Sequence, residues 1–201
     1  MRMSPDLLLA LFLISFLSNA TPFFGASYTL IAAGLLSKSG FTAFNLFEII
    51  LITGVGASVS KNVMYAIGIG VKGPLSRNKN SEFLRRIIKN RSFYFALLVL
   101  AFIPLLPLDD FMYIGGGAAK ASPLKVNLVA LVGKVMKSSF EIPLEMAGLG
   151  LIGSVTSAIG LGAFRLSLIS TLVFLLLGVV LLKIDWEVTE KRVKARFKLR
   201  F

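Results

Sequence analysis

Short hydrophobic runs alternate with long ones along the chain. Residues 7 to 17 and 23 to 36 are both apolar, but each is shorter than the roughly 20 residues that a helix needs to cross a bilayer. Pro22 lacks an amide proton and Gly25 lowers helix stability, so both interrupt this region. Two half-length segments around such a break predict a re-entrant hairpin that enters and leaves a membrane on one side. The alternative for the first segment is a cleaved signal peptide.

The second half of the chain repeats this order. Residues 92 to 108 form a short apolar run that contains Pro104 and Pro107, and a glycine-rich segment returns through Gly117. Residues 154 to 163 are small and uncharged, and they are predicted to form a loop. The segments long enough to span a membrane are residues 45 to 69, 126 to 152 and 164 to 183. In the first of these, four glycines predict close helix contacts: Gly54, Gly56, Gly68 and Gly70.

Residues 22 to 46 align with residues 104 to 128 at a constant offset of 82. The identities include Pro22 with Pro104 and Lys38 with Lys120. Interrupted segments at matching places in two halves point to a binding site at the repeat interface. The predicted fold is an all-α integral membrane protein. It comprises an inverted repeat of re-entrant hairpin plus transmembrane helix, with an extra C-terminal transmembrane helix.

A single membrane domain is expected over residues 1 to 201. Its parts are a first repeat at about 5 to 71, a basic interfacial linker at 72 to 91, a second repeat at about 92 to 152, a final span at 164 to 183 and a basic cytoplasmic tail at 184 to 201.

The amino-acid composition agrees with a membrane protein and limits the reactive side chains that a site could contain. The chain is 56% hydrophobic and its mean hydropathy is +0.82. It has no cysteine and no histidine, so it lacks thiol chemistry, the commonest metal ligand and the commonest general base. With no Gly-x-Ser-x-Gly motif either, we expect no enzyme, no metal and no cofactor.

The net charge of +12 is concentrated beside the hydrophobic spans. Residues 72 to 91 contain seven basic residues against one glutamate, and the tail is also basic. This placement is typical of cytoplasmic loops in contact with anionic lipid, so nucleic-acid binding is not expected. The predicted number of crossings puts linker and tail on one side, the cytoplasmic side of a multi-pass protein in the cell membrane. The linker is either a helix on the membrane surface or a solvated loop.

Four charged residues form the main candidate site. Lys134, Lys137, Glu141 and Glu145 follow one another at steps of three, four and four, which places them on one stripe of a helix. At about 2.5–3.5 kcal/mol per central charge, this stripe would cost on the order of 10 kcal/mol if it faced lipid. It should therefore face the protein interior or water. The plainer interpretation is that Lys137 and Glu141 only neutralise each other.

Three further charges are candidates. Lys61 lies among small residues of the first long span, where it either snorkels toward the cytoplasmic side or contacts a headgroup. Asp109 and Asp110 follow the second proline break. They either cap the returning helix, or hold a proton because neighbouring desolvated carboxylates repel each other.

Three stretches resemble the DedA/VTT (SNARE-associated Golgi protein-like) membrane proteins of archaeal or bacterial type. They are "TPFFGASYTLIAAGLL" (21 to 36), "GASVSKNVMYAIG" (56 to 68) and "FIPLLPLDDFMYIGGGAAKAS" (102 to 122). The chain departs from the bacterial pattern: Lys61 stands where an acidic residue is usual, Ser18 or Asn19 replaces a glutamate, and the arginines of the second hairpin are missing. The resemblance implies movement of phospholipid or of a polyprenyl-phosphate carrier.

The first functional hypothesis is a lipid scramblase or lipid-carrier translocase with a polar groove where two hairpins meet. Lysines would meet phosphate, and the carboxylates would meet an amine or a coupling proton. The alternative is a proton- or cation-coupled transporter of a small solute, and a structural subunit or homo-oligomer is a further possibility. The predicted binding residues are Lys61, Asp109, Asp110, Lys134, Lys137, Glu141 and Glu145.

Overall fold

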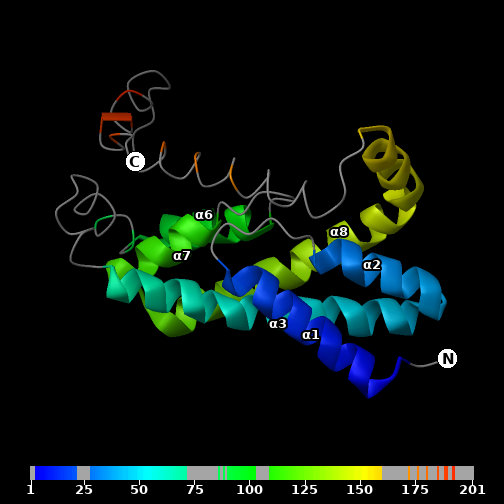
Figure 1. Ribbon diagram of the computed structural model, residues 1–201. Helices are drawn as coiled ribbons and strands as arrows, with labels where there is room; N and C mark the ends of the chain where they lie inside the picture. The colour runs from blue at the N-terminus through cyan, green and yellow to red at the C-terminus, as the bar shows by residue number, and fades with distance from the viewer. Residues whose placement is uncertain are drawn as a thin grey trace.

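The computed structural model describes residues 3–21, 28–71, 90–102 and 109–159, together with isolated positions between 86 and 192. Within these residues every regular element is a helix, so the all-α prediction is confirmed there. The elements are α1 (Pro5–Ala20), α2 (Tyr28–Ser39), α3 (Ala43–Gly70), α6 (Arg91–Phe102), α7 (Asp109–Ala118) and α8 (Pro123–Ile159) (Figure 1). The predicted break residues Pro22, Gly25, Pro104 and Pro107 lie outside the described residues, as do most of the linker, the final span and the tail.

Local sequence explains where the first and third helices begin. Ser4 caps α1 by accepting a hydrogen bond from the amide of Leu7 at 3.4 Å, and Pro5 occupies the first helical position, where a missing N–H costs nothing. Thr42 caps α3 in the same way, from the amide of Asn45 at 3.1 Å. These caps fix the start of α3 close to the predicted start of the first long span.

The helix α8 is longer than the sequence pattern predicts. It runs through Pro143 and continues to Ile159, so the loop predicted at 154 to 163 is wrong over its helical part. Small uncharged residues are compatible with a helix as well as with a loop, and no proline interrupts residues 144 to 163. Pro143 removes one backbone hydrogen bond, and the C-terminal part of α8 takes a different direction from the rest (Figure 1).

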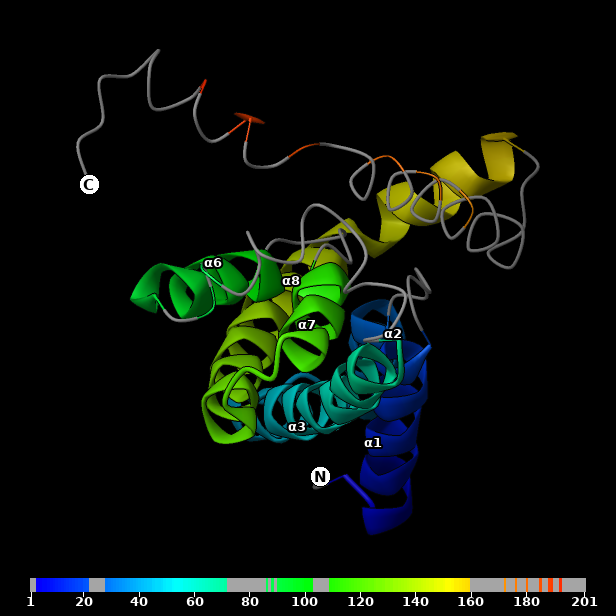
Figure 2. The same ribbon diagram turned by 90° about the vertical axis from the view of Figure 1, so that its left-hand side faces the viewer.

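The helix α3 lies at the centre of the bundle. It packs against α1 on one side and against α7 and α8 on the other, while α6 lies outside α8 (Figure 2). The helices α3 and α8 run antiparallel: Thr53 donates a hydrogen bond to Ser138 at 3.2 Å, and nearer the other end the hydroxyl of Tyr65 donates to the carbonyl of Ala121 at 2.7 Å.

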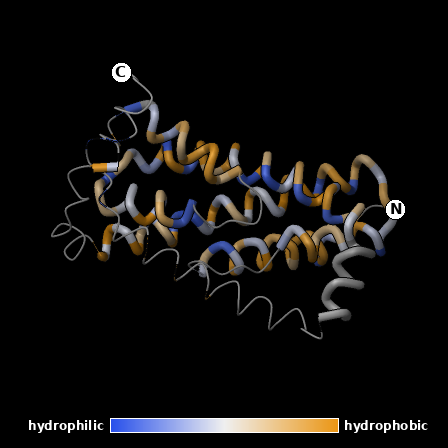
Figure 3. The backbone as a smooth tube through the Cα atoms, turned by 90° about the horizontal axis from the view of Figure 1, so that it is seen from above, coloured by the Kyte–Doolittle hydropathy of each residue, from blue (hydrophilic) through white to orange (hydrophobic). Residues whose placement is uncertain are grey.

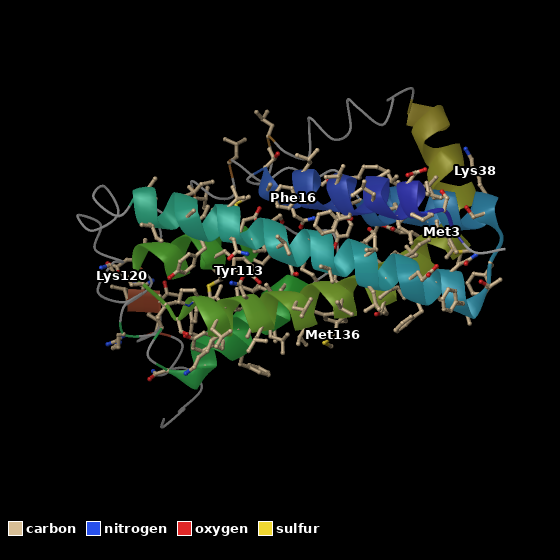
Figure 4. All side chains as sticks on the ribbon, turned by 90° about the horizontal axis from the view of Figure 1, so that it is seen from below. Met3, Phe16, Lys38, Tyr113, Lys120 and Met136 are labelled. Atoms are coloured by element: carbon tan, nitrogen blue, oxygen red, sulfur yellow. The ribbon has the colours of Figure 1, made fainter. Side chains whose placement is uncertain are left out.

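The short helices form two pairs at opposite ends of the bundle. Met3, before α1, and Lys38, in the last turn of α2, lie at one end, whereas Lys120, after α7, lies at the other (Figure 4). The helix α6 starts beside α7, where Phe93 contacts Gly116, and ends beside the middle of α8. Each pair therefore begins and finishes at the same end of the bundle.

Glycines allow the closest helix approaches. A Cβ atom at Gly68 would overlap the carbonyl oxygen of Ile114, and one at Gly117 would overlap the carbonyl oxygen of Tyr65. These reciprocal overlaps show that α3 and α7 are in backbone contact. Gly54 and Gly56 make the predicted close contacts with α8 and α1: Gly54 meets Val135, and Gly56 meets the carbonyl of Phe12. The prediction for Gly70 is wrong, because a Cβ there meets nothing within 4 Å among the described residues.

Charged and polar side chains are buried inside the bundle, whereas many large apolar side chains are exposed on its outer surface. The outer face of α8 carries large apolar side chains such as Leu128, Met136 and Phe140, which are 55%, 44% and 51% exposed. Its inner face carries lysines, Ser138 and Glu141, all buried. The outer face of α3 is similar, with Phe44, Phe47, Leu51, Val59, Val63 and Ile69 exposed. Hydrophobic positions lie along all the described helices (Figure 3), and Figure 4 shows Met136 on the outer edge with Tyr113 inside.

Exposed charges in the bundle lie at its two ends. Asp6 and Lys38 are exposed at the end where α1 begins, and Lys120 and Lys125 are exposed at the opposite end. Of the described helices, α3 alone is both long and apolar enough to cross a membrane; it contains 28 residues. The helix α8 is longer but carries four charges in its middle.

Candidate functional site

Three helices bring the seven predicted site residues into one interior cluster. Lys61 comes from α3, Asp109 and Asp110 from the first turn of α7, and the remaining four from α8. We call this set the charged cluster: Lys61, Asp109, Asp110, Lys134, Lys137, Glu141 and Glu145. Six of its members are buried and Glu145 is half-buried, so the prediction that the stripe on α8 faces inward is confirmed.

Two lysines and two aspartates form the more enclosed part. The ammonium group of Lys134 lies 2.7 Å from a carboxylate oxygen of Asp109, and that of Lys61 lies 3.4 Å from the same oxygen. Lys61 also forms an ion pair and hydrogen bond with Asp110, and it lies 5.6 Å from the ring centre of Tyr113. Both positive and both negative charges in this group are therefore directly neutralised.

This geometry corrects two predictions. Lys61 does not snorkel, because its side chain is 2% exposed and faces the aspartates. The aspartates begin α7, where their charge suits the helix N-terminus, but their carboxylates are held by lysines. A proton is consequently not needed to relieve repulsion between them. Sequence spacing could not reveal these ion pairs, since Lys61 and Asp110 are 49 residues apart.

The two glutamates form the other part of the cluster, toward α2. The hydroxyl of Thr29 lies 3.1 Å from a carboxylate oxygen of Glu141 and 3.0 Å from one of Glu145. Lys137 lies 3.8 Å from the other oxygen of Glu141, one helical turn away. Mutual neutralisation of Lys137 and Glu141 is thus present, but at a long distance.

Uncharged polar groups from α2, α7 and α8 complete the cluster, and the sequence reasoning missed them. Tyr28 and Tyr113 are buried, and the hydroxyl of Tyr113 makes no hydrogen bond within the described residues. Tyr28 lies beside Ser138 and Glu141. The only available signal for Tyr28 and Thr29 was their place at the start of the returning helix, where Asp109 and Asp110 stand in the second half.

The cluster occupies the central part of the bundle. Lys61 is nine residues before the end of α3, or about 14 Å at 1.5 Å per residue. Thr29 is ten residues before the end of α2, or about 15 Å from the opposite end. The charges are therefore far from the exposed charged residues at both ends of the bundle, in a region surrounded by apolar side chains.

The cluster offers ammonium groups, carboxylates and hydroxyls. Such groups can bind a phosphate, an amine or a proton. Among the described residues no group of three or more carboxylate, imidazole or thiol side chains is placed to hold a metal ion. Comparisons with protein-family models, with curated proteins and with solved structures found no match for this chain.

Proposed function

We propose that this chain is a multi-pass membrane protein that moves lipid headgroups across the bilayer, as a phospholipid scramblase or as a translocase of a polyprenyl-phosphate carrier. The observation that carries the proposal is a buried charged cluster enclosed by helices whose outer faces are apolar. The kinship with DedA/VTT proteins is part of the proposal and rests on the sequence resemblance alone.

The burial of charged side chains and the exposure of large apolar ones support a lipid environment. In water, lysines and carboxylates are almost always exposed, and a continuous outer face of leucine and phenylalanine is an aggregation surface. Among lipid acyl chains the preferences are opposite: apolar side chains face outward, and charged side chains face the protein interior. Length fits as well: 28 residues of α3 extend about 42 Å, close to the 40–45 Å of a bilayer with its headgroups. The exposed charges at the two ends would then lie at headgroup level.

The paired short helices support two re-entrant hairpins. The helices α1, α2, α6 and α7 have 16, 12, 12 and 10 residues, each shorter than a bilayer requires. The pairs enter from opposite ends, as an inverted repeat requires. Matching boundaries recur at a nearly constant interval: α6 ends 82 positions after α1, α7 begins 81 after α2, and α8 begins 80 after α3.

Contacts made by the two halves of the chain are related by the same shift of about 80 positions. In the first half, Thr29 in the first turn of α2 contacts Glu141 of α8. In the second half, Asp110 in the first turn of α7 contacts Lys61 of α3. Since Lys61 and Glu141 are 80 positions apart, these two contacts are equivalent in the repeat. The charged cluster is then the repeat interface, which is where transporters of inverted-repeat architecture bind their substrates.

Lys137 is the best-placed phosphate ligand. Its side chain is 10% exposed, against 2% for Lys61 and Lys134, and its ammonium group lies 3.8 Å from Glu141, a longer distance than the 2.7 Å between Lys134 and Asp109. A lipid phosphate could replace Glu141 as its partner while the acyl chains remain outside the bundle. Carboxylates of the cluster would meet an amine headgroup. The basic linker and tail would face the cytoplasm and bind anionic lipid.

A second candidate is a proton- or cation-coupled transporter of a small solute. The specific observation in its favour is the near-complete enclosure of Lys61, Lys134 and Asp109. An enclosed site suits a solute smaller than a lipid headgroup, whereas lipid movement requires the helices to part at Lys137.

Reconstitution in liposomes tests the first candidate. Purified protein is inserted into phosphatidylcholine vesicles that contain a trace of fluorescent lipid, and an impermeant reductant is added outside. Protein-free vesicles lose about half of the signal, because only the outer leaflet is accessible. If the chain moves lipid, vesicles that contain it lose nearly all of the signal. Lys137→Ala should slow the loss at least tenfold, which corresponds to about 1.4 kcal/mol.

The matched control is Lys38→Ala, which removes an exposed lysine at the end of the bundle. Its rate should equal that of the wild type. Lipid movement at the protein-free rate, with folded wild-type protein in the vesicles, would refute the lipid proposal and leave the solute transporter. Equal rates for Lys137→Ala and Lys38→Ala would refute the assignment of the site.

A further inference from the structure

A carboxylate outside the charged cluster has no partner among the described residues. Glu48 of α3 is half-buried, and its Oε2 atom is buried without accepting a hydrogen bond. Each carboxylate of the charged cluster, by contrast, contacts an ammonium group or a hydroxyl group. A carboxylate oxygen that is buried without a hydrogen bond is costly, so a cation that donates hydrogen bonds is expected at this position.

Glu48 lies near the end of the bundle where α2 ends and α3 begins, which is also the end of Lys38 (Figure 4). It is five residues after Ala43, or about 8 Å along the helix at 1.5 Å per residue. In the proposed membrane placement, the hydrocarbon core takes up about 30 Å of a thickness of 40–45 Å, so Glu48 lies where headgroups meet acyl chains. Helical side chains tilt toward the N-terminus of their helix, so Glu48 extends toward the headgroups.

The side chains that border Glu48 on the outer face of α3 are apolar. Phe44, one helical turn before Glu48, is 46% exposed, and Leu51, one turn after it, is 38% exposed. The adjacent Phe47 is 58% exposed. Residues three and four positions apart lie on one face of a helix, so Phe44 and Leu51 lie on either side of the carboxylate. In a membrane this surface faces lipid, and lipid headgroups are the nearest source of a cation.

The chemistry of the position distinguishes between cations. Ca²⁺ takes roughly six to eight oxygen ligands, whereas Glu48 offers a single carboxylate, and the described residues contain no group of three or more metal-binding side chains. A quaternary ammonium group has no N–H to donate. A primary ammonium group donates up to three hydrogen bonds and carries the opposite charge. An acceptor oxygen that is buried without a donor therefore fits a primary ammonium group.

We propose that Glu48 binds the primary ammonium group of a membrane lipid of the ethanolamine type on the outer face of α3. The ammonium group donates a hydrogen bond to Oε2, and the acyl chains lie against Phe44 and Leu51. A serine headgroup fits less well, because its own carboxylate is repelled by Glu48. The inference rests on the membrane placement in the proposed function, but it does not require that lipid is moved.

Native mass spectrometry tests this binding. The protein is released from mixed micelles that contain equal amounts of phosphatidylethanolamine, phosphatidylcholine and phosphatidylglycerol with identical acyl chains, and the retained lipids are compared. The wild type should retain phosphatidylethanolamine in preference to phosphatidylcholine. Glu48→Gln keeps the shape of the side chain and removes its charge, so it should lower this preference about tenfold. Glu48→Lys should instead retain phosphatidylglycerol, because the charge at the position is reversed.

The matched control is Asp6→Asn, which removes an exposed carboxylate at the same end of the bundle. Its lipid preference should equal that of the wild type. Equal retention of the ethanolamine and choline lipids by folded wild-type protein would overturn the proposal. An unchanged preference in Glu48→Gln would also overturn it, and so would full displacement of the lipid by water-soluble phosphoethanolamine, which would indicate a site for a free amine.

The liposome assay separates this proposal from the proposed function. A normal preference for phosphatidylethanolamine, in a protein that moves no lipid, would refute the proposed function and leave the Glu48 site in place. Lipid movement by a protein without this preference would refute the Glu48 site alone.

Discussion

Replacing Lys134 by methionine provides the most direct test of the charged cluster. The side chain is 2% exposed, and its ammonium group lies 2.7 Å from Asp109. Methionine has nearly the same length and no charge, so packing is largely preserved. Asp109 would keep one ion-pair partner, Lys61 at 3.4 Å, which it already shares with Asp110. Two buried carboxylates would then compete for one ammonium group.

The expected loss of stability is large. Removing one partner of a buried ion pair leaves an uncompensated charge and typically costs 3–5 kcal/mol. For a chain of this size, that loss lowers the unfolding midpoint by roughly 10 °C. Replacing both partners is often neutral or stabilising, because no charge is then left unpaired. The double variant Lys134→Met/Asp109→Leu keeps the ion pair between Lys61 and Asp110, and it should recover most of the lost stability.

The assay is the fraction of protein that elutes at the native position in size-exclusion chromatography after heating in detergent. Wild type, both single variants and the double variant form a double-mutant cycle. Two results would refute the reasoning. One is a midpoint for Lys134→Met within about 2 °C of the wild type. The other is a double variant as unstable as the worse single variant, which would show that the two side chains are not coupled.

Three further predictions concern packing, the turn after α7, and topology. Gly117→Ala should destabilise the protein by about 1–3 kcal/mol in the same heating assay, because a Cβ there overlaps the carbonyl of Tyr65. The control is Gly34→Ala, which should be neutral or slightly stabilising because its Cβ meets nothing within 4 Å among the described residues. Lys120→Gly should raise stability by about 1 kcal/mol, because Lys120 has a φ of 59° that L-residues with a side chain disfavour; an unchanged or lower midpoint would contradict this. The chain has no cysteine, so Lys38→Cys and Lys120→Cys can be labelled one at a time in sealed vesicles of known orientation. An impermeant maleimide should reach the two positions from opposite sides of the membrane. Labelling of both positions from the same side would exclude the inverted arrangement.

The helix positions were predictable because they depend on local patterns. Apolar runs indicated α1, α3 and the start of α6 within a few residues, and the glycine-rich return indicated α7. The inward stripe of α8 was also predictable, since steps of three and four place side chains on one helical face. The end of α8 was not, because its small uncharged residues satisfy a helix and a loop equally well.

The partners of the site residues could not be predicted. Thr29 and Glu141 are 112 residues apart, and Lys61 and Asp110 are 49 apart. Periodicity shows which face of a helix is polar, but it does not show which polar groups of two helices meet. The spacing of the predicted repeat was the sole long-range signal in the sequence, and it did not identify Tyr28 or Thr29.

The central position of the charges has an electrical consequence. In a cell membrane, voltage falls across the low-dielectric interior, and moving one elementary charge through all of it changes the energy by about 2.3 kcal/mol per 100 mV. In the proposed membrane placement, the lysines and carboxylates of the cluster lie where this field acts. A displacement of α3 against α7 would move Lys61 and the two aspartates, which carry opposite charge, in opposite directions, so their contributions would add. Under the proposed function, turnover in energised vesicles should therefore depend on voltage even if the transported molecule is electrically neutral.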